Sequence, residues 1–305
     1  MLAAIIALPA AAKRIYQFTD EQGIVHITDV PPETEQPVTS RPVKVDTKGP
    51  LAVYQTGIEH RFPQRFQNRL YGPLEVEVKL VEAENIHSDP PLPGRFVLEP
   101  QYFGDLLQFR PADPRRGYRL QISYRAVPGA PGVVHDQQAR YLPPVPARQR
   151  FRISQGFNGG QTHTTPDSRY AVDIPMDEGT PVVAARSGIV MDVQDDFYEG
   201  GADLERYGQR ANRVIILHSD GTMAVYAHLA PESAYARPGQ TVLAGEMVGR
   251  SGNTGYSTGP HLHFAIQRNA GMRLESVPFY FRAENGADIL PESGAVLVGY
   301  KPGVE

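Results

Sequence analysis

The sequence of 305 residues contains no cysteine. This absence excludes a disulfide-stapled scaffold, thiol chemistry, cysteine-ligated zinc fingers and a lipid-modified N-terminal cysteine. Any metal site must therefore be built from His, Asp or Glu side chains. An excess of positive charge is also missing, since 30 Lys and Arg against 34 Asp and Glu give a net charge of −4. We therefore expect no nucleic-acid partner.

Long apolar runs and helical patterns are missing as well. No stretch approaches the ~20 apolar residues that span a bilayer, and no segment keeps a helical period of apolar residues over several turns. The 29 glycines and 28 prolines instead favour many short strands and turns. A chain of this length favours about two domains. The sequence therefore predicts an all-β protein with more than one domain.

The first twelve residues, MLAAIIALPAAA, join an apolar run to small residues. This pattern is typical of a secretory signal, although the positively charged region that usually precedes the apolar run is missing. We interpret residues 1–12 as a signal-peptide-like segment, with an apolar N-terminal tail as the alternative. The interpretation predicts an exported protein of the periplasm or cell envelope, with no stable membrane insertion once the signal is removed.

Residues 13–45 are predicted to form a small N-terminal β module. Apolar residues at positions 15–18 and 24–27 flank a polar turn that ends in Gly23, which indicates a strand, a turn and a returning strand. The motif from Phe18 to Gly23, followed by His26, resembles a small domain of unknown function. In many proteobacterial envelope proteins that domain comes directly after the signal.

Residues 51–146 are predicted to form a β-sandwich-like domain. Residues 74–80 alternate apolar and charged side chains with a period of two, the pattern of a half-buried strand. Residues 96–98 and 118–124 continue this pattern between turn signals. Residues 143–146, PPVP, would form a stiff extended hinge. The role of this middle domain stays open between binding the cell wall and inhibiting the domain that follows.

Residues 150–285 are predicted to form a second all-β domain, followed by a C-terminal tail over 286–305. Short apolar runs alternate there with glycine turns, as in PVVAA at 181–185 and IVMDV at 189–193. A polar insertion over 195–211 interrupts this pattern and is predicted to be a surface loop, with at most a helical turn.

His261 and His263 form the sharpest chemical signal in the chain. Residues two apart in a strand point to the same face, so both imidazoles project together while Leu262 points to the core. In a chain without cysteine, such a pair is half of a zinc site. His228 and Asp173 each follow a predicted strand and are ambiguous alone, because such residues are more often structural.

The motifs of this domain, taken together, resemble the lysostaphin-type (LytM-domain) zinc metalloendopeptidases. They occur in this order: Asp173, Gly179-Thr180-Pro181-Val182, Gly188-Ile189-Val190, His218-Ser219-Asp220-Gly221-Thr222, Tyr226-Ala227-His228-Leu229 and Gly259-Pro260-His261-Leu262-His263-Phe264. The resemblance implies an antiparallel all-β fold, one zinc ion per chain and hydrolysis of peptide bonds in peptidoglycan. It implies that Asp173 and His263 are zinc ligands and that His228 and His261 are the two catalytic histidines.

One position departs from the family pattern. The family's first zinc ligand is a histidine four residues before the aspartate, and Arg169 stands there in this chain. An arginine stays protonated and cannot coordinate a metal ion. We expect His163, ten residues before Asp173, to replace it through a longer loop. The alternative is a site with weak zinc binding or none.

The resemblance thus predicts an enzyme, a zinc-dependent protease that hydrolyses the peptide stems of peptidoglycan. The alternative is a catalytically degenerate relative that binds the wall or activates another wall hydrolase. A third possibility is a structural envelope protein in which the middle domain carries the function. The sequence leaves open the oligomeric state and the scissile bond, whether D-alanyl–diaminopimelate or another cross-link.

Overall fold

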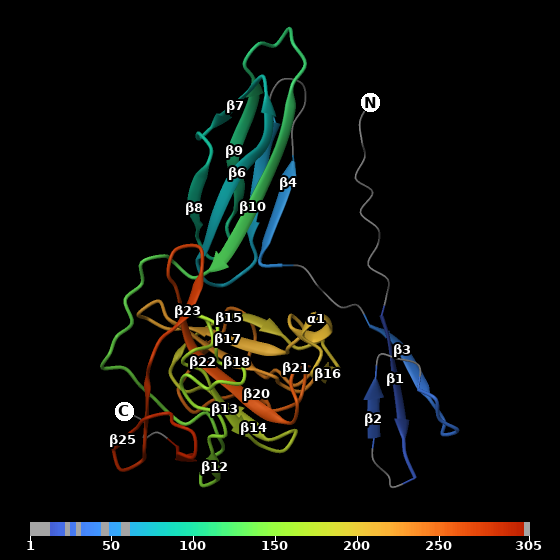
Figure 1. Ribbon diagram of the computed structural model, residues 1–305, viewed down its shortest axis with the longest axis vertical. Helices are drawn as coiled ribbons and strands as arrows, with labels where there is room; N and C mark the ends of the chain where they lie inside the picture. Colours follow the sequence, from blue (N-terminus) through green and yellow to red (C-terminus); the bar gives the residue numbers. More distant parts are fainter. Residues whose placement is uncertain (1–12, 22–24, 29–31, 44–48, 56–61, 302–305) are drawn as a thin grey trace.

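The computed structural model of the chain describes residues 13–21, 25–28, 32–43, 49–55 and 62–301 (Figure 1). The predicted signal segment, residues 1–12, lies outside these ranges. The described chain is built almost entirely of β-strands, and its one helix, α1 (Leu204–Tyr207), makes a single turn. This confirms the predicted all-β class. Within the described ranges, no helix has the length and apolar character needed to cross a bilayer.

The N-terminal module is a three-stranded antiparallel sheet in the order β2-β1-β3. Its strands are β1 (Lys13–Thr19), β2 (Val25–Thr28) and β3 (Thr39–Val43). The pairing of β1 with β2 matches the predicted strand, turn and strand, with Phe18 opposite His26. The third strand falls where the sequence indicated the start of a linker. Among the described residues, this sheet shares no strand pairing with the rest of the chain.

The middle domain consists of two sheets that enclose one core, which confirms the predicted sandwich. One sheet has the order β10-β6-β8 and the other β4-β5-β9-β7. Phe66, Leu74, Val76 and Phe109 are fully buried between them. The strands are β4 (Leu51–Gln55), β5 (Phe62–Asn68), β6 (Leu74–Glu84), β7 (Ile86–Asp89), β8 (Gly94–Leu98), β9 (Phe103–Pro111) and β10 (Arg119–Pro128).

The C-terminal domain holds the remaining sixteen strands, most of them short. They are β11 (Arg140–Tyr141), β12 (Arg150–Arg152), β13 (Val172–Pro175), β14 (Pro181–Val183), β15 (Gly188–Gln194), β16 (Gly200–Gly201), β17 (Arg213–Leu217), β18 (Met223–Ala227), β19 (Thr241–Val242), β20 (Met247–Arg250), β21 (Gly255–Tyr256), β22 (His261–Asn269), β23 (Leu274–Ser276), β24 (Tyr280–Arg282), β25 (Asp288–Ile289) and β26 (Val296–Val298). The main sheet runs β13-β22-β18-β17-β15-β19, with β23 added beside β22.

The two faces of this main sheet have different surroundings. Alternate residues of its strands, among them Val172, Val214, Tyr226 and Phe264, point into the core of the C-terminal domain. The residues between them, such as Asp173 and His263, therefore lie on the opposite face. We call this the outer face of the sheet. The metal-ligand candidates of the sequence thus lie on the face that is not needed for the core.

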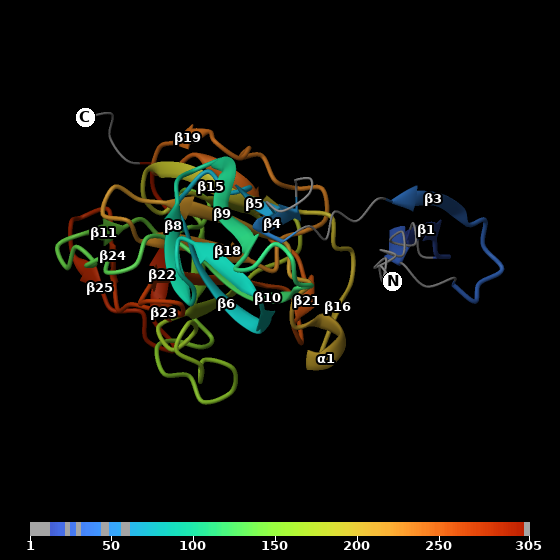
Figure 2. The same ribbon diagram turned by 90° about the horizontal axis from the view of Figure 1, so that it is seen from above.

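The middle domain stands on part of this outer face, above the main sheet in Figure 1. Met191 and Met223 of the C-terminal domain are buried in the apolar core of the middle domain. Beside them, the carboxylate of Glu75, 4% exposed, accepts hydrogen bonds from the Asn269 amide at 2.9 Å and the Met272 backbone N–H at 2.6 Å. Asn269 is the last residue of β22 and His261 is the first, so these contacts lie at the end of the strand away from His261. Seen from above, β6 and β8 of the middle domain lie over the C-terminal domain (Figure 2).

Two segments differ from their predicted roles. Residues 143–146 do not form a free hinge, because Val145 is buried in the core of the C-terminal domain together with nearby Tyr141. The stretch over 286–305, predicted as a tail, contributes β25, paired with β24, and β26, paired with β12. Leu297 of β26 is fully buried in the same core. Both segments complete the domain rather than lead to or from it.

Candidate metal centre and catalytic site

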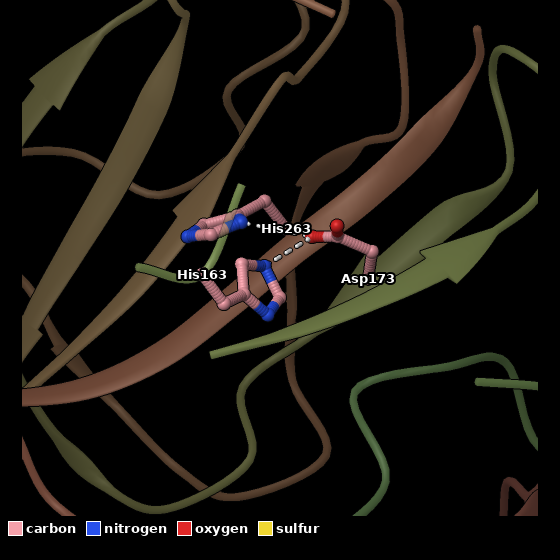
Figure 3. Close-up of side chains that lie close together, drawn as sticks. All are labelled: His163, Asp173 and His263. Carbon is pink, nitrogen blue, oxygen red and sulfur yellow. Dashed lines mark hydrogen bonds and ion pairs between the residues drawn. The ribbon is translucent and has the colours of Figure 1, made fainter. Parts of the chain in front are cut away.

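Three side chains from separate parts of the C-terminal domain meet on the outer face of the sheet (Figure 3). Asp173 lies on β13 directly opposite His263 on β22, and His163 approaches from the loop before β13. Each of the three residues offers one possible ligand atom, and these atoms, two ring nitrogens and one carboxylate oxygen, lie within 4.8 Å of one another. Two imidazoles and a carboxylate at this spacing can hold one divalent metal ion.

The loop over 158–171 carries His163 to this position. Its base is closed by a hydrogen bond from the Asn158 N–H to the Arg169 carbonyl at 2.7 Å. The imidazole of His163 is buried, and its Nδ1 donates to the Gly156 carbonyl at 3.2 Å, so its Nε2 faces Asp173 at 3.2 Å. Arg169 is exposed at the surface. The loop therefore places His163 beside Asp173, whereas Arg169, four positions before Asp173, lies at the surface.

Gln155 orients the carboxylate that the two histidines share. Its amide donates to Oδ2 of Asp173 at 3.1 Å and to the hydroxyl of Thr162 at 2.6 Å. The other carboxylate oxygen, Oδ1, lies 2.9 Å from Nδ1 of His263. Burial alone would raise the pKa of Asp173, but hydrogen bonds from His163 and His263 outweigh it and hold this pKa far below its usual range. The carboxylate is therefore ionised, as a metal ligand must be.

His228 and His261 lie beside these three residues with fixed orientations. Nδ1 of His228 donates to the Thr254 carbonyl at 2.7 Å, and Nδ1 of His261 donates to the Gly259 carbonyl at 2.8 Å. A carbonyl oxygen can only accept, so each Nδ1 carries the proton and each Nε2 is a free acceptor in the neutral ring. The two ring centres are 4.6 Å apart, and Nε2 of His261 lies 3.7 Å from Asp173.

Local backbone geometry supports these orientations. His228 itself has a positive φ of 61°, a conformation that is uncommon for residues with a side chain and turns its imidazole out of β18. Gly255 has a φ of 80° and meets Ala211 so closely that a Cβ would lie 2.7 Å from it. The turn that supplies the Thr254 carbonyl therefore requires glycine at this position.

Burial keeps both of these histidines uncharged. It lowers the pKa of His228 to about 3, assisted by the nearby imidazoles of His261 and His263. Burial likewise lowers the pKa of His261, although Asp173 opposes this effect. At neutral pH both rings are therefore proton acceptors. By contrast, burial would lower the pKa of His163, but the hydrogen bond that its ring donates to the Asp173 carboxylate outweighs burial and raises this pKa.

A cleft of about 600 Å³ opens beside the five residues. Asp173 and His261 line it, together with the glycine-rich stretch at 159–161 and the turn at 258–260. Its walls carry few bulky side chains, so an extended polypeptide backbone can approach the site closely.

The structure brings together all five residues that the sequence analysis selected: His163, Asp173, His228, His261 and His263. It places His218 elsewhere, where its Nδ1 donates to the Ser187 carbonyl at 2.9 Å. The sequence analysis missed Gln155, because a lone glutamine near a glycine turn carries no recognisable pattern. It also did not predict that the carbonyl groups of Thr254 and Gly259 accept hydrogen bonds from His228 and His261.

Comparison with known families assigns two parts of the chain. Residues 167–274 match the model described as peptidase family M23, and residues 2–53 match a domain of unknown function, DUF4124. Both matches agree with the resemblances drawn from the sequence motifs. The M23 match includes Arg169 and four of the five site residues, but it begins after His163.

Two curated proteins and one solved structure are similar to parts of this chain. An uncharacterised metalloprotease of Haemophilus influenzae is 35% identical over 154 residues, which cover 48% of this chain and 30% of that protein. The peptidoglycan DD-endopeptidase ShyA of Vibrio cholerae is 33% identical over 135 residues, which cover 43% of this chain and 28% of that protein. The solved catalytic domain of lysostaphin from Staphylococcus simulans is 30% identical, with a TM-score of 0.27, covering 41% of this chain and 83% of that domain. The chain thus spans less than a third of the length of the two curated relatives, the metalloprotease and ShyA.

Proposed function

We propose, from the premise that residues 167–274 are a peptidase family M23 domain of the LytM type, that the protein is a zinc-dependent endopeptidase. Its proposed substrates are the peptide cross-links of peptidoglycan in the cell envelope, which it would reach by export. The observation that carries this proposal is the convergence of His163, Asp173 and His263 within 4.8 Å, beside two neutral histidines.

The donor set fits zinc. Two imidazole nitrogens and one carboxylate oxygen are a common catalytic ligand set for Zn²⁺ and leave a further coordination position open. In this assignment His163 binds through Nε2, Asp173 through Oδ1 and His263 through Nδ1, the atoms that already face one another. When bound, zinc would supply Lewis-acid activation of water and of the scissile carbonyl group.

The chain's own residues would handle the protons of the reaction. The free Nε2 atoms of His228 and His261 are the two proton acceptors next to the ligands, and both rings are held in place by carbonyl groups. One would accept the proton that water loses on attacking the scissile carbonyl. The other would donate a hydrogen bond to the developing oxyanion or a proton to the leaving amine. Gln155 would hold Asp173 in the orientation that binding requires.

The alternative, a degenerate relative that binds the wall or activates another hydrolase, predicts gaps at these positions. In our proposal all five positions are filled, because His163 would supply the ligand that is missing at Arg169. The deciding experiment measures the zinc content of the purified protein and its release of soluble fragments from isolated peptidoglycan, for the wild type and His261→Ala. One zinc per chain, with digestion that His261→Ala abolishes, is expected. A protein without zinc, or digestion that His261→Ala leaves intact, would overturn the proposal.

A further inference from the structure

A second cleft, separate from the metal centre, lies where the middle and C-terminal domains meet. It has a volume of about 410 Å³ and is lined by three arginines: Arg69 from the middle domain, and Arg210 and Arg213 from the C-terminal domain. Asp192 is the one acidic residue among its described lining residues. We call this the arginine cleft. Residues of both domains thus contribute to its lining.

The arginine cleft has an uncompensated positive charge. Nη2 of Arg213 lies 3.3 Å from Oδ2 of Asp192, which balances one guanidinium. Arg69 donates to the Gly49 carbonyl at 3.2 Å, and neither it nor the exposed Arg210 has an ion-pair partner within the described part of the chain. Two guanidinium groups therefore face a cleft in a protein whose net charge is −4. Their planar forks match a carboxylate in shape and charge.

The register of the main sheet relates the arginine cleft to the metal centre. Successive pairings cross the strands β13, β22, β18, β17 and β15. In this order the paired residues are Asp173, His263, Ala227, Arg213 and Gln194. Directly paired residues in neighbouring strands share a face. The metal-ligand pair and two lining residues of the cleft thus belong to one row across the outer face.

The spacing within this row corresponds to a short peptide. Neighbouring strands lie about 4.8 Å apart, so Arg213 is about 10 Å from His263 and about 14 Å from Asp173 along the row. An extended peptide advances about 3.3–3.6 Å per residue. A ligand with a peptide bond at the metal centre would therefore place a group three or four residues away within reach of the arginines.

We propose that the arginine cleft binds a free carboxylate of the same peptide polymer whose bond is cut at the metal centre. This inference rests on the proposed function, because that function defines the peptide substrate. The arginines of the cleft would favour a negatively charged group on that peptide. The middle domain then contributes to substrate recognition through Arg69. A carboxylate three or four residues from the scissile bond would be the feature that the protein distinguishes.

The test compares binding of one soluble cross-linked wall peptide in two forms, with free carboxylates and with the same groups converted to carboxamides. Titration calorimetry on the zinc-loaded full-length chain, in a His261→Ala background that prevents cleavage, measures both affinities. Arg210→Gln is expected to weaken binding of the free-carboxylate form roughly tenfold, since a charge-assisted hydrogen bond is lost. It should leave binding of the carboxamide form unchanged. Arg237→Gln, the same change at an exposed position of the same domain outside the cleft, should alter neither affinity.

Arg210→Lys serves as a second variant, which keeps the charge but loses the planar fork, and should give an intermediate affinity. Equal affinities of the parent for the two peptide forms would overturn the proposal. So would an Arg210→Gln variant that binds the free-carboxylate form as tightly as its parent. Digestion of peptidoglycan by the wild type is measured separately. If digestion fails while Arg210 still governs binding, the hydrolytic function is refuted and the arginine cleft stands.

Discussion

Nδ1 of His263 lies 2.9 Å from Oδ1 of Asp173, although 90 positions separate the two residues in the sequence. The pairing of β13 with β22 places them directly opposite each other, so the main sheet itself assembles two of the three proposed ligands. Only His163 depends on a loop. The loop is therefore the part of the candidate metal centre in which this chain departs from the family's four-residue spacing, and the part where substitution is most informative.

Replacement of His163 tests that loop directly. His163→Ala removes one of three proposed ligands and should weaken zinc binding by more than the about 10–100-fold that loss of an outer hydrogen-bond partner costs. Zinc affinity, measured by competition with a chelating dye, checks this. Arg169→Ala is the matched control within the same loop, and it should bind zinc like the wild type. A result in which Arg169→Ala loses zinc and His163→Ala keeps it would reverse the assignment.

Gln155 should behave as a positioning residue for Asp173. Gln155→Ala removes the amide that donates to Oδ2 of Asp173 at 3.1 Å, and we expect zinc affinity to fall about 10–100-fold with the fold retained. Gln155→Glu preserves the size of the side chain but adds a negative charge beside the carboxylate. Circular dichroism checks the fold, and Gln138→Ala, at an exposed site, is the control. Unchanged zinc affinity in Gln155→Ala would show that the sheet alone fixes Asp173.

His228 and His261 should separate catalysis from metal binding. His228→Ala and His261→Ala are each expected to lower the rate of peptidoglycan digestion by about 10²–10⁴-fold. Both variants should retain zinc, because neither residue belongs to the His163, Asp173 and His263 group. Digestion rates and zinc content of the same preparations provide the measurement, with exposed His87→Ala as the control. Loss of zinc in either variant would mean that the residue is a ligand instead.

The buried His218 predicts how stability depends on pH. Burial lowers its pKa from 6.5 to about 4, so the unfolded chain takes up a proton before the folded one as the pH falls. The free energy of unfolding should therefore be fully present above pH 6.5 and fall between pH 6.5 and 4, by about 3 kcal/mol from this residue. His218→Asn can still donate to the Ser187 carbonyl but does not titrate.

Urea unfolding at a series of pH values measures this effect. The difference in unfolding free energy between the wild type and His218→Asn should change across the window, while contributions from the other histidines cancel. A difference that is constant from pH 7 to pH 4 would contradict the prediction.

Glu75 should couple the stability of the two large domains. Glu75→Ala leaves the Met272 N–H and part of the Asn269 amide without their buried acceptor, which costs about 1–3 kcal/mol for an unsatisfied group. Chemical unfolding of the full chain checks the loss. Glu82→Ala, on the same strand but exposed, should change stability by less than about 0.5 kcal/mol. Equal stabilities of the two variants would argue against an energetic role for this contact.

The sequence predicted those parts of the fold that leave a local pattern. The alternation at 74–80 identified β6, and the spacing of His261 and His263 identified two imidazoles on one face of β22. The choice of His163 came from the resemblance, which left one ligand position unfilled at Arg169, and His163 is the nearest histidine before Asp173. The two-residue period of a strand thus pointed to β6 and to the histidines of β22, and the number of ligands that the resemblance implies for the metal ion pointed to His163.

The other features of the fold and of the site depend on contacts between residues far apart in the sequence, and local sequence patterns do not indicate such contacts. Strands of two or three residues, such as β25 and β26, are too short to show a period, so their segment looked like a tail. Gln155 donates a hydrogen bond to Asp173, 18 positions away, only because the fold brings the two residues together. The arginine cleft likewise joins Arg69 to Arg210 across a domain contact. Long-range pairing determines each of these features, and no local propensity encodes it.

The burial of Met191 and Met223 inside the neighbouring sandwich has a practical consequence for dissecting this protein. A fragment starting near residue 150, the boundary that the sequence suggests, would leave both thioethers and the adjoining apolar strands facing water. Such a surface promotes self-association. The smallest fragment that keeps these side chains covered therefore begins before β4, and the C-terminal domain in isolation is expected to self-associate.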